Sequence, residues 1–236
     1  MLFSRTRKKL AFKVRKLIFD WGGLQGMLDQ AETRVLEQSM GFPGQWEEHR
    51  RFQFEFLCSN GLQPGSRLLE FGCGPLTLGI PAIEFLDSHR YVGIDVRPAA
   101  LDLAYRQIGK HGLSGKNARL ICSDQFGAEQ LGDERFDFIW CFSVLYHLTD
   151  ELVSRCLAEA SRRLAPGGKF FANVNTEQGS STWLEFPYLR RDLQFYLSLA
   201  AKHGLNAVAL GRLQELGLRR TTLEKSDQLL RFELAR

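Results

Sequence analysis

Long apolar runs and paired cysteines are the clearest absences in this 236-residue chain. No segment approaches the roughly 18–20 consecutive apolar residues of a transmembrane helix, and residues 1–20 lack the apolar stretch of a signal peptide. The five cysteines are odd in number and form no Cys-x-x-Cys pair, which argues against a disulfide framework and a zinc site. We therefore expect buried free thiols in a cytoplasmic protein. An organellar transit peptide stays open, because the N-terminal segment is basic and amphipathic.

A disordered or fibrous composition is absent as well. Apolar residues make up 44% of the chain and charged residues 25%, both close to the average of a globular domain. The length fits one domain, or one domain with a helical appendage. These values exclude a collagen-like or mainly disordered protein.

The net charge of +4 is concentrated at the N-terminus. Residues 1–20 carry seven Lys or Arg and one acidic residue, whereas the remainder is nearly neutral, so no nucleic-acid-binding surface spread over the whole protein is expected. Apolar residues recur in this segment at the spacing of an amphipathic helix; they are Phe3, Leu10, Val14, Leu17 and Trp21. Two uses stay open: the apolar stripe packs on the body, or the helix contacts an anionic membrane or another polyanion.

After two further helices, near residues 27–39 and 45–60, the pattern changes to short apolar runs separated by helical stretches. The spacing of the first five runs is typical of βα units, and the last two are too close for another crossover. The predicted strands are 68–71, 91–94, 119–122, 136–142, 169–174, 206–210 and 229–234. We predict an α/β fold, with a doubly wound, mostly parallel seven-stranded sheet whose last strand is antiparallel. Expected domains are a helical extension or lid (1–62) and a ligand-binding domain (63–236).

Glycines follow the first predicted strand, in the run Glu70-Phe71-Gly72-Cys73-Gly74. Glycine at a strand end lets the backbone approach a ligand closely. The third glycine of a dinucleotide fingerprint is absent, because Thr77 stands at that position, which argues against a pyrophosphate-binding dehydrogenase.

Carboxylates come at the ends of the next two strands. Asp95 ends the second strand, where an acidic side chain can accept hydrogen bonds from both ribose hydroxyls, and Asp124 follows the third. Each aspartate alone also suits a helix N-cap. Together with the glycine turn, the pair favours a nucleoside ligand that has no phosphate to repel.

With these pieces in place, residues 62–211 resemble the class I S-adenosylmethionine (SAM)-dependent methyltransferases. The matching segments are 70–74, 94–95, 123–124, 136–141 and 164–168. Leu76 replaces the third glycine common in that family, and the run 72–81 is similar to a subgroup associated with glycan or other small-molecule methylation. The resemblance implies SAM as cofactor and a role for each matching residue. The implied contacts are Glu70, Gly72 and Gly74 to the methionine and ribose part, Asp95 to the ribose diol, Val96 to adenine, Asp124 and Gln125 to the adenine amino group, and Ser143 near the sulfonium.

The exit of the fourth strand, residues 141–147, narrows the reaction type. It lacks the Asp/Asn-Pro-Pro-aromatic motif and the Pro-Cys pair that similar enzymes use on nucleic-acid bases or amides. The acidic cluster of metal-dependent catechol-type enzymes is not recognisable either. These absences favour metal-free transfer to an oxygen or nitrogen of a small molecule, with His147 as candidate base and Tyr146 beside it. A structural hydrogen bond is the alternative role for His147.

Three further expectations concern residues outside the motifs. Four histidines are expected at the surface or at helix caps; they are His49, His89, His111 and His203. Residues 175–188 are expected to form an aromatic loop, which either packs on the body or walls the acceptor pocket. Residues 45–51 either close over the cofactor or form a solvated helix face.

The predicted function is a SAM-dependent methyltransferase acting on an oxygen, less readily a nitrogen, of a small molecule or glycan precursor. One alternative is methylation of a membrane lipid or an RNA through the basic N-terminus, which would make the protein membrane-peripheral in the first case. Another is a catalytically silent SAM-binding regulatory subunit. No metal is expected, and a nucleic-acid partner is disfavoured.

Overall fold

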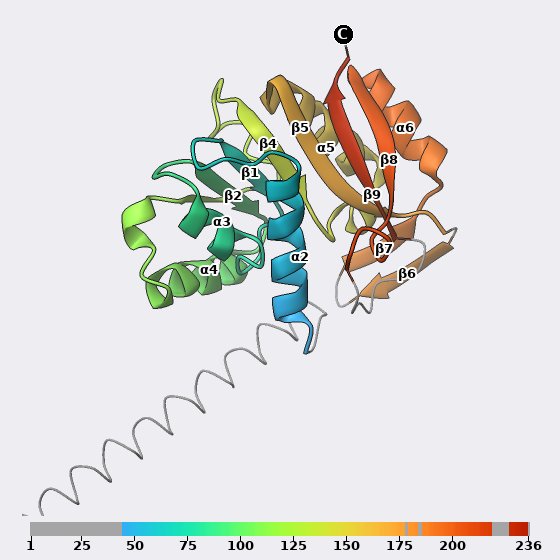
Figure 1. Ribbon diagram of the computed structural model, residues 1–236. Coiled ribbons are helices and arrows are strands. Elements are labelled where there is room, and N and C mark those ends of the chain that lie inside the picture. Colours follow the sequence, from blue (N-terminus) through green and yellow to red (C-terminus); the bar gives the residue numbers. More distant parts are fainter. Residues whose placement is uncertain (1–43, 178, 184–185, 219–226, 236) are drawn as a thin grey trace, which may run out of the picture. The chain divides into compact units, whose positions relative to one another are not determined.

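The computed structural model describes residues 44–177, 179–183, 186–218 and 227–235 (Figure 1). The chain divides into two compact units, Met1–Gln45 and Trp46–Arg236, and the second unit contains every element described below. The basic amphipathic helix and the helix near residues 27–39 lie outside the described residues.

A seven-stranded sheet forms the centre of the second unit, with strand order β3-β2-β1-β4-β5-β9-β8. β1 to β5 pair in parallel, whereas β9 pairs antiparallel with both β5 and β8. This topology confirms the predicted sheet and its antiparallel last strand. The strands are β1 (Leu68–Phe71), β2 (Tyr91–Asp95), β3 (Arg119–Cys122), β4 (Phe136–Cys141), β5 (Leu164–Asn175), β8 (Leu205–Arg212) and β9 (Asp227–Leu234).

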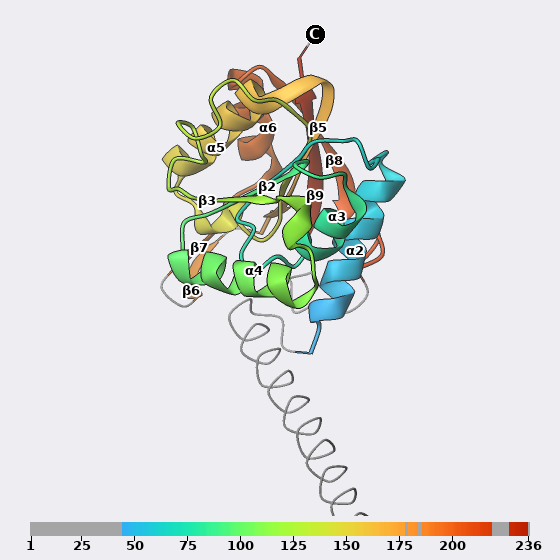
Figure 2. The same cartoon turned by 90° about the vertical axis from the view of Figure 1, so that its left-hand side faces the viewer.

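Helices cover both faces of the sheet (Figures 1 and 2). One apolar cluster joins the sheet to α2, α3 and α4, and a second joins it to α5 and α6, which confirms the doubly wound arrangement. β1 and β2 are buried along their whole length, as strands covered on two faces must be. The helices are α2 (Trp46–Ser59), α3 (Gly79–Phe85), α4 (Pro98–Lys110), η1 (Ser114–Lys116), η2 (Leu145–His147), α5 (Asp150–Arg163) and α6 (Leu193–Lys202).

Helix α2 packs directly against the sheet. The buried Trp140 donates its indole N–H to the Gln53 side chain (2.8 Å), and Phe56 meets Phe171 of β5 edge to face at 5.3 Å. The domain boundary expected after residue 62 therefore falls inside the second compact unit, because α2 completes one face of its core.

A small second sheet lies after β5, where the sequence was expected to form a loop. β6 (Gly179–Trp183) and β7 (Phe186–Arg190) pair antiparallel through five residue pairs. The loop prediction was wrong because these strands lack the alternation of buried and exposed side chains by which a strand is recognised. In β7 every side chain is half-buried, so its sequence carries no alternating apolar pattern. Figure 1 shows this hairpin beyond the ends of β5 and β9.

The thiols follow the prediction only in part. Cys73, Cys141 and Cys156 are free and buried, whereas Cys122 is free and exposed at the edge strand β3. None of the helices within the described ranges is long and apolar enough to span a membrane.

Candidate functional site

The glycine turn after β1 is held in a left-handed backbone conformation. Gly72, Gly74 and Leu76 have φ values of +70°, +50° and +69°. A β-carbon on Gly72 would lie 2.3 Å from a methyl carbon of Val144, which follows β4. The turn and the exit of β4 are therefore in close contact, and only glycine fits at position 72.

Asp95 connects β2 to this turn. Its Oδ2 accepts the backbone N–H of Gly74 (2.8 Å), and its Oδ1 accepts the backbone N–H of Arg97 (2.9 Å). The side chain is buried, whereas the next residue, Val96, is 51% exposed. An anionic hydrogen-bond acceptor thus lies beside an open apolar surface, both at the carboxyl end of the sheet, where open α/β sheets bind ligands.

The predicted adenine-binding residues lie on the neighbouring loop. Asp124 and Gln125 are exposed beyond the end of β3. The Ser123 hydroxyl accepts the N–H groups of Gln125 and Gly127 at 3.1 Å, which fixes the loop. The side-chain amide oxygen of Gln125 accepts a hydrogen bond from Arg155 (3.1 Å), so part of its hydrogen-bonding capacity is used within the protein.

Glu70 is directed into the protein interior. The Tyr91 hydroxyl donates to its Oε2 at 2.5 Å, and the carboxyl is almost fully buried. Burial, with a smaller contribution from the Asp95 charge, raises the pKa of Glu70 to about 8, although the Tyr91 hydrogen bond opposes the shift. At neutral pH Glu70 is therefore largely protonated.

At the exit of β4, Ser143 has a φ of +59°, a conformation that is rare for serine. Its backbone N–H donates to the side-chain oxygen of Asn173 on β5 (2.6 Å), which holds the unusual turn in place. Ser143 and Asn173 also lie beside the buried Tyr146 hydroxyl. Sequence reasoning found Ser143 but not Asn173, whose position inside an apolar run carried no signal.

His147 contacts the hairpin. Its Nδ1 lies 2.8 Å from the carbonyl oxygen of Pro187 on β7. A carbonyl only accepts, so Nδ1 carries the proton, and Nε2 is the ring nitrogen that can accept one. Burial lowers the pKa of His147 below its usual value, and the Arg97 charge acts in the same direction. The imidazole is therefore neutral at pH 7, as a general base requires.

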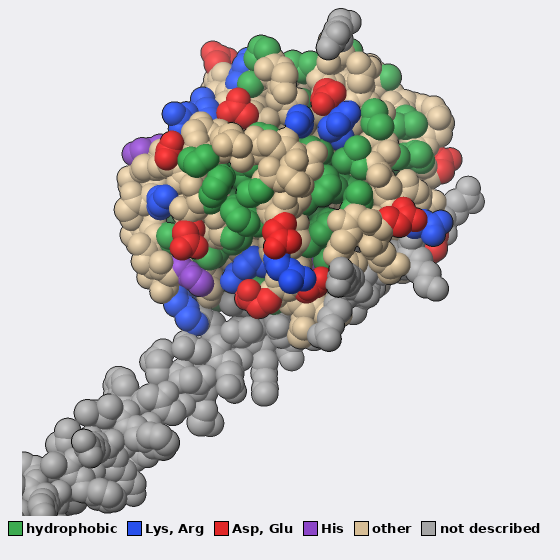
Figure 3. All heavy atoms as spheres, viewed as in Figure 1, with side chains coloured by type: hydrophobic (Ala, Val, Ile, Leu, Met, Phe, Trp, Pro, Cys, Tyr) green, Lys and Arg blue, Asp and Glu red, His purple; other side chains and the backbone are tan. Residues whose placement is uncertain are grey.

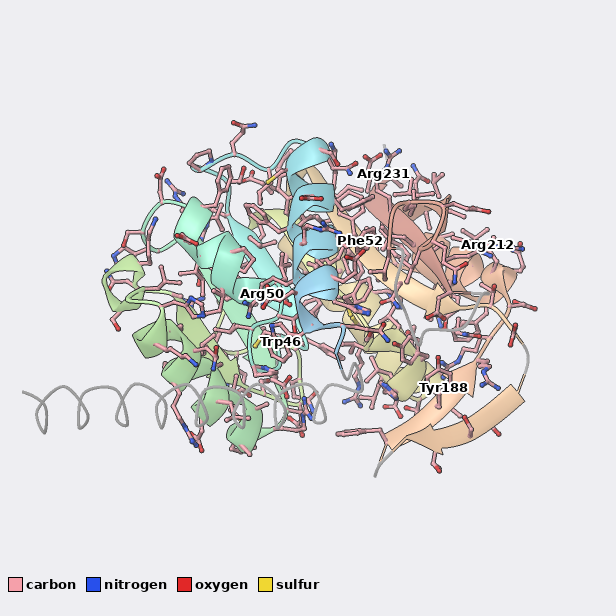
Figure 4. All side chains as sticks on the ribbon, turned by 60° about the horizontal axis from the view of Figure 1, so that its bottom comes forward. Trp46, Arg50, Phe52, Tyr188, Arg212 and Arg231 are labelled. Carbon is pink, nitrogen blue, oxygen red and sulfur yellow. The ribbon has the colours of Figure 1, made fainter. Side chains whose placement is uncertain are left out.

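Tyr146 has a different character. It is buried, and its ring lies 4.6 Å from the Tyr188 ring of β7. Burial raises the pKa of Tyr146 well above its usual value, so the phenol stays protonated and serves as a hydrogen-bond donor rather than a base. Tyr146 and His147 thus bring η2 and the exit of β4 into contact with β7, the strand on which Figure 4 labels Tyr188.

The expectation for His49 was wrong. It is fully buried on α2, 6.1 Å from the Phe142 ring, and burial lowers its pKa to about 4. His111 and His203, by contrast, occupy the C-caps of α4 and α6, as expected of capping residues. The helical spacing of residues 45–60 predicted that a helix forms there. It did not predict that His49 lies on the buried face of this helix.

The first turns of α2 reach the loop that follows the glycine turn. Arg50 donates from Nε to the Thr77 carbonyl oxygen at 3.2 Å, and its guanidinium lies over the Trp46 ring at 5.4 Å (Figure 4). The charged residues of this segment pair within the helix, as Arg50 with Glu47 and Arg51 with Glu48. On the face drawn in Figure 3, basic and acidic side chains accordingly lie next to one another.

Metal-ligating side chains do not gather near these residues. Across the described ranges, no group of three or more His, Cys, Asp or Glu side chains is arranged to hold an ion.

Residues 68–168, from β1 to the start of β5, match the methyltransferase domain family. This match and the sheet order support the resemblance of the chain to class I SAM-dependent methyltransferases. The match covers the glycine turn, Asp95, Asp124 and His147, which are the sequence-predicted residues that the fold brings to one edge. Among similar proteins, the ribosomal protein L11 methyltransferase of Symbiobacterium thermophilum is 31% identical to this chain over 140 residues. That alignment spans 54% of this chain and only 42% of the relative.

Solved structures share the fold at low sequence identity. A SAM-dependent methyltransferase from Clostridium acetobutylicum superimposes with a TM-score of 0.64 at 13% identity, over 89% of this chain and 100% of the other. The magnesium protoporphyrin IX methyltransferase of Synechocystis PCC 6803, crystallised with SAM, gives a TM-score of 0.60 at 16% identity, with 80% of each chain covered. At these identities the likeness shows the methyltransferase fold and not the substrate.

Proposed function

We propose that the protein transfers the methyl group of SAM to an oxygen, less readily a nitrogen, of a small molecule or glycan precursor, without a metal ion. The observation that carries the cofactor part is Asp95, a buried carboxylate between the glycine turn and the exposed Val96. These residues lie within the family match.

The residues present fit SAM. Asp95 uses two hydrogen bonds to place its carboxylate, and a carboxylate has further lone pairs to offer a ribose diol. Val96 offers an apolar surface to adenine, with Asp124 and Gln125 at its edge. Thr77 Oγ1 is buried beside the glycine turn without a hydrogen-bond partner among the described residues, which leaves a polar group for the ligand. When bound, SAM supplies an electrophilic methyl group on a positively charged sulfur.

The acceptor half of the site is organised around His147. The Pro187 carbonyl orients the ring, so that Nε2 can take the proton of an acceptor hydroxyl as its oxygen becomes methylated. Tyr146, held protonated by burial, donates a hydrogen bond that positions the acceptor. The hairpin covers these groups and limits the access of water.

The named relatives act on unlike acceptors, a ribosomal protein in one case and a magnesium porphyrin in another. The proposed class of acceptor therefore rests on His147 and the half-buried hairpin, and not on the acceptors of similar proteins. Methylation of a lipid or an RNA through residues 1–20, and a silent SAM-binding role, are the competing functions.

The proposal predicts methyl transfer from labelled SAM to at least one hydroxyl compound in a panel of alcohols, phenols, sugars, amines, lipid vesicles and RNA. Liquid-chromatography detection of the labelled product gives both the acceptor and the methylated atom. Labelling only of vesicles or RNA would replace the proposal by the first alternative. No labelling of any class, with cofactor binding intact, would favour the silent subunit.

A further inference from the structure

Arg97 occupies a position where local rules disfavour arginine. It is the N-cap of α4, with an extended backbone and no side-chain cap hydrogen bond, and Pro98 follows at the first helical position. N-caps are normally Ser, Thr, Asp or Asn, and a cation is repelled by the positive end of a helix dipole. A residue that breaks such a rule is often retained for binding or catalysis.

The Arg97 side chain is directed toward the acceptor half of the site. Its Nε lies 3.4 Å from Asp95 Oδ1, and its guanidinium carbon lies 5.9 Å from the centre of the Phe186 ring on β7. Its charge also acts on His147. Arg97 follows β2, whereas the hairpin follows β5, and β1 and β4 lie between these two strands in the sheet. The Arg97 side chain therefore reaches along the carboxyl edge from the cofactor half of the site toward the acceptor half.

The outer nitrogens of Arg97 remain available. Within the described part of the chain, neither Nη has a hydrogen-bond acceptor, and the side chain is 30% exposed. The Asp95 contact uses only Nε, and at a long distance, so the forked face that matches carboxylate or phosphate is open.

We propose that Arg97 determines acceptor specificity by binding an anionic oxygen group, a carboxylate or phosphate, of the molecule to be methylated. This inference rests on the proposed function and names its substrate class as acidic hydroxyl compounds. Two Nη–H donors hold the anion near Phe186, and the acceptor hydroxyl is then presented to His147 Nε2.

Matched acceptor pairs test this directly. Each pair differs only in charge: 3- and 4-hydroxybenzoate against their amides, glycerate against its amide, and hexose phosphates against hexoses. For the wild type we expect kcat/KM at least about tenfold higher for the charged member of the preferred pair. Arg97→Gln should remove this preference, so that charged and neutral members of a pair give similar kcat/KM values, and Arg97→Lys should restore part of it. The carboxylate and phosphate pairs show which anion is used.

Arg106→Gln is the matched control, since Arg106 is exposed on the same helix. Benzoate and inorganic phosphate serve as direct probes: with S-adenosylhomocysteine bound, at least one should bind to the wild type and to Arg106→Gln but at least about fivefold more weakly to Arg97→Gln. Equal losses on charged and neutral acceptors, or no wild-type binding of either probe together with no charge preference, would overturn the inference. Failure to bind S-adenosylhomocysteine would instead overturn the proposed function.

Discussion

Replacing His147 with alanine is expected to lower kcat by about 10²–10⁴-fold while the affinity for S-adenosylhomocysteine stays nearly constant. The Pro187 carbonyl fixes the proton on Nδ1, and burial keeps the ring neutral, so Nε2 is prepared to take a proton at pH 7. Steady-state kinetics with an acceptor from the panel measures the change in kcat. Calorimetric titration with S-adenosylhomocysteine measures the change in cofactor affinity separately.

The pH profile distinguishes a base from a structural histidine. Only neutral His147 can act as a base, so kcat/KM should rise with pH through the histidine pKa, whose midpoint lies below 6.5, and stay flat above it. His147→Asn can keep a hydrogen bond to Pro187 but has no basic nitrogen. If this variant retained activity within about threefold of the wild type, His147 would be a structural residue and orientation alone would account for the rate.

Gly72→Ala is expected to destabilise the domain by about 2–4 kcal/mol, from left-handed strain of about 1–2 and overpacking of a similar size. The new β-carbon would lie 2.3 Å from the Val144 methyl carbon, and a β-branched side chain has little freedom to move away. Urea unfolding of the wild type and the variant measures the change in the free energy of unfolding.

Two controls separate the contributions. Gly112 has a φ of +67° with nothing within 4 Å of the position that a β-carbon would take, so Gly112→Ala carries the backbone strain without the clash. Gly72→Ala combined with Val144→Ala removes the clash and keeps the strain. We expect Gly72→Ala to exceed Gly112→Ala by at least about 1 kcal/mol. Equal effects would mean that the turn does not pack against the exit of β4.

The sheet could be predicted because its central strands β1 and β2 are fully buried and end beside recognisable residues. Leu68–Phe71 is a mainly apolar run followed by Gly72, and Asp95 is the last residue of the next strand. Each of these signals is local, and the parallel arrangement brings them to one edge. Tyr146 and His147 reached the same edge for the same reason, as they follow β4 by a few residues.

The remaining features depend on contacts that no local pattern encodes. His49 is buried because of the way α2 lies on Phe142, and the half-buried hairpin lacks the apolar alternation of a core strand. Arg97 was missed, although Pro98 at the first helical position marked the helix start and placed an arginine at the cap. The partner of that arginine, Phe186, is distant in sequence.

Leu76 shows how a departure from a motif can be accommodated. It takes the left-handed conformation that suits glycine, with a φ of +69°, yet its side chain is fully buried. Burial of a leucine contributes about 2 kcal/mol, which offsets strain of about 1–2 kcal/mol. The missing glycine is visible in the sequence, but this compensation is not.

Calorimetric titration with S-adenosylhomocysteine is the most direct test of the central claim that the Asp95 edge binds SAM. Wild-type protein should bind, and Asp95→Asn should bind more weakly by about 1.5–3 kcal/mol, the scale of hydrogen bonds to a charged group. Asparagine keeps an oxygen for the Gly74 N–H, so the fold should persist, which a melting curve checks. Absence of binding by the wild type, or unchanged affinity in a folded Asp95→Asn variant, would contradict the account.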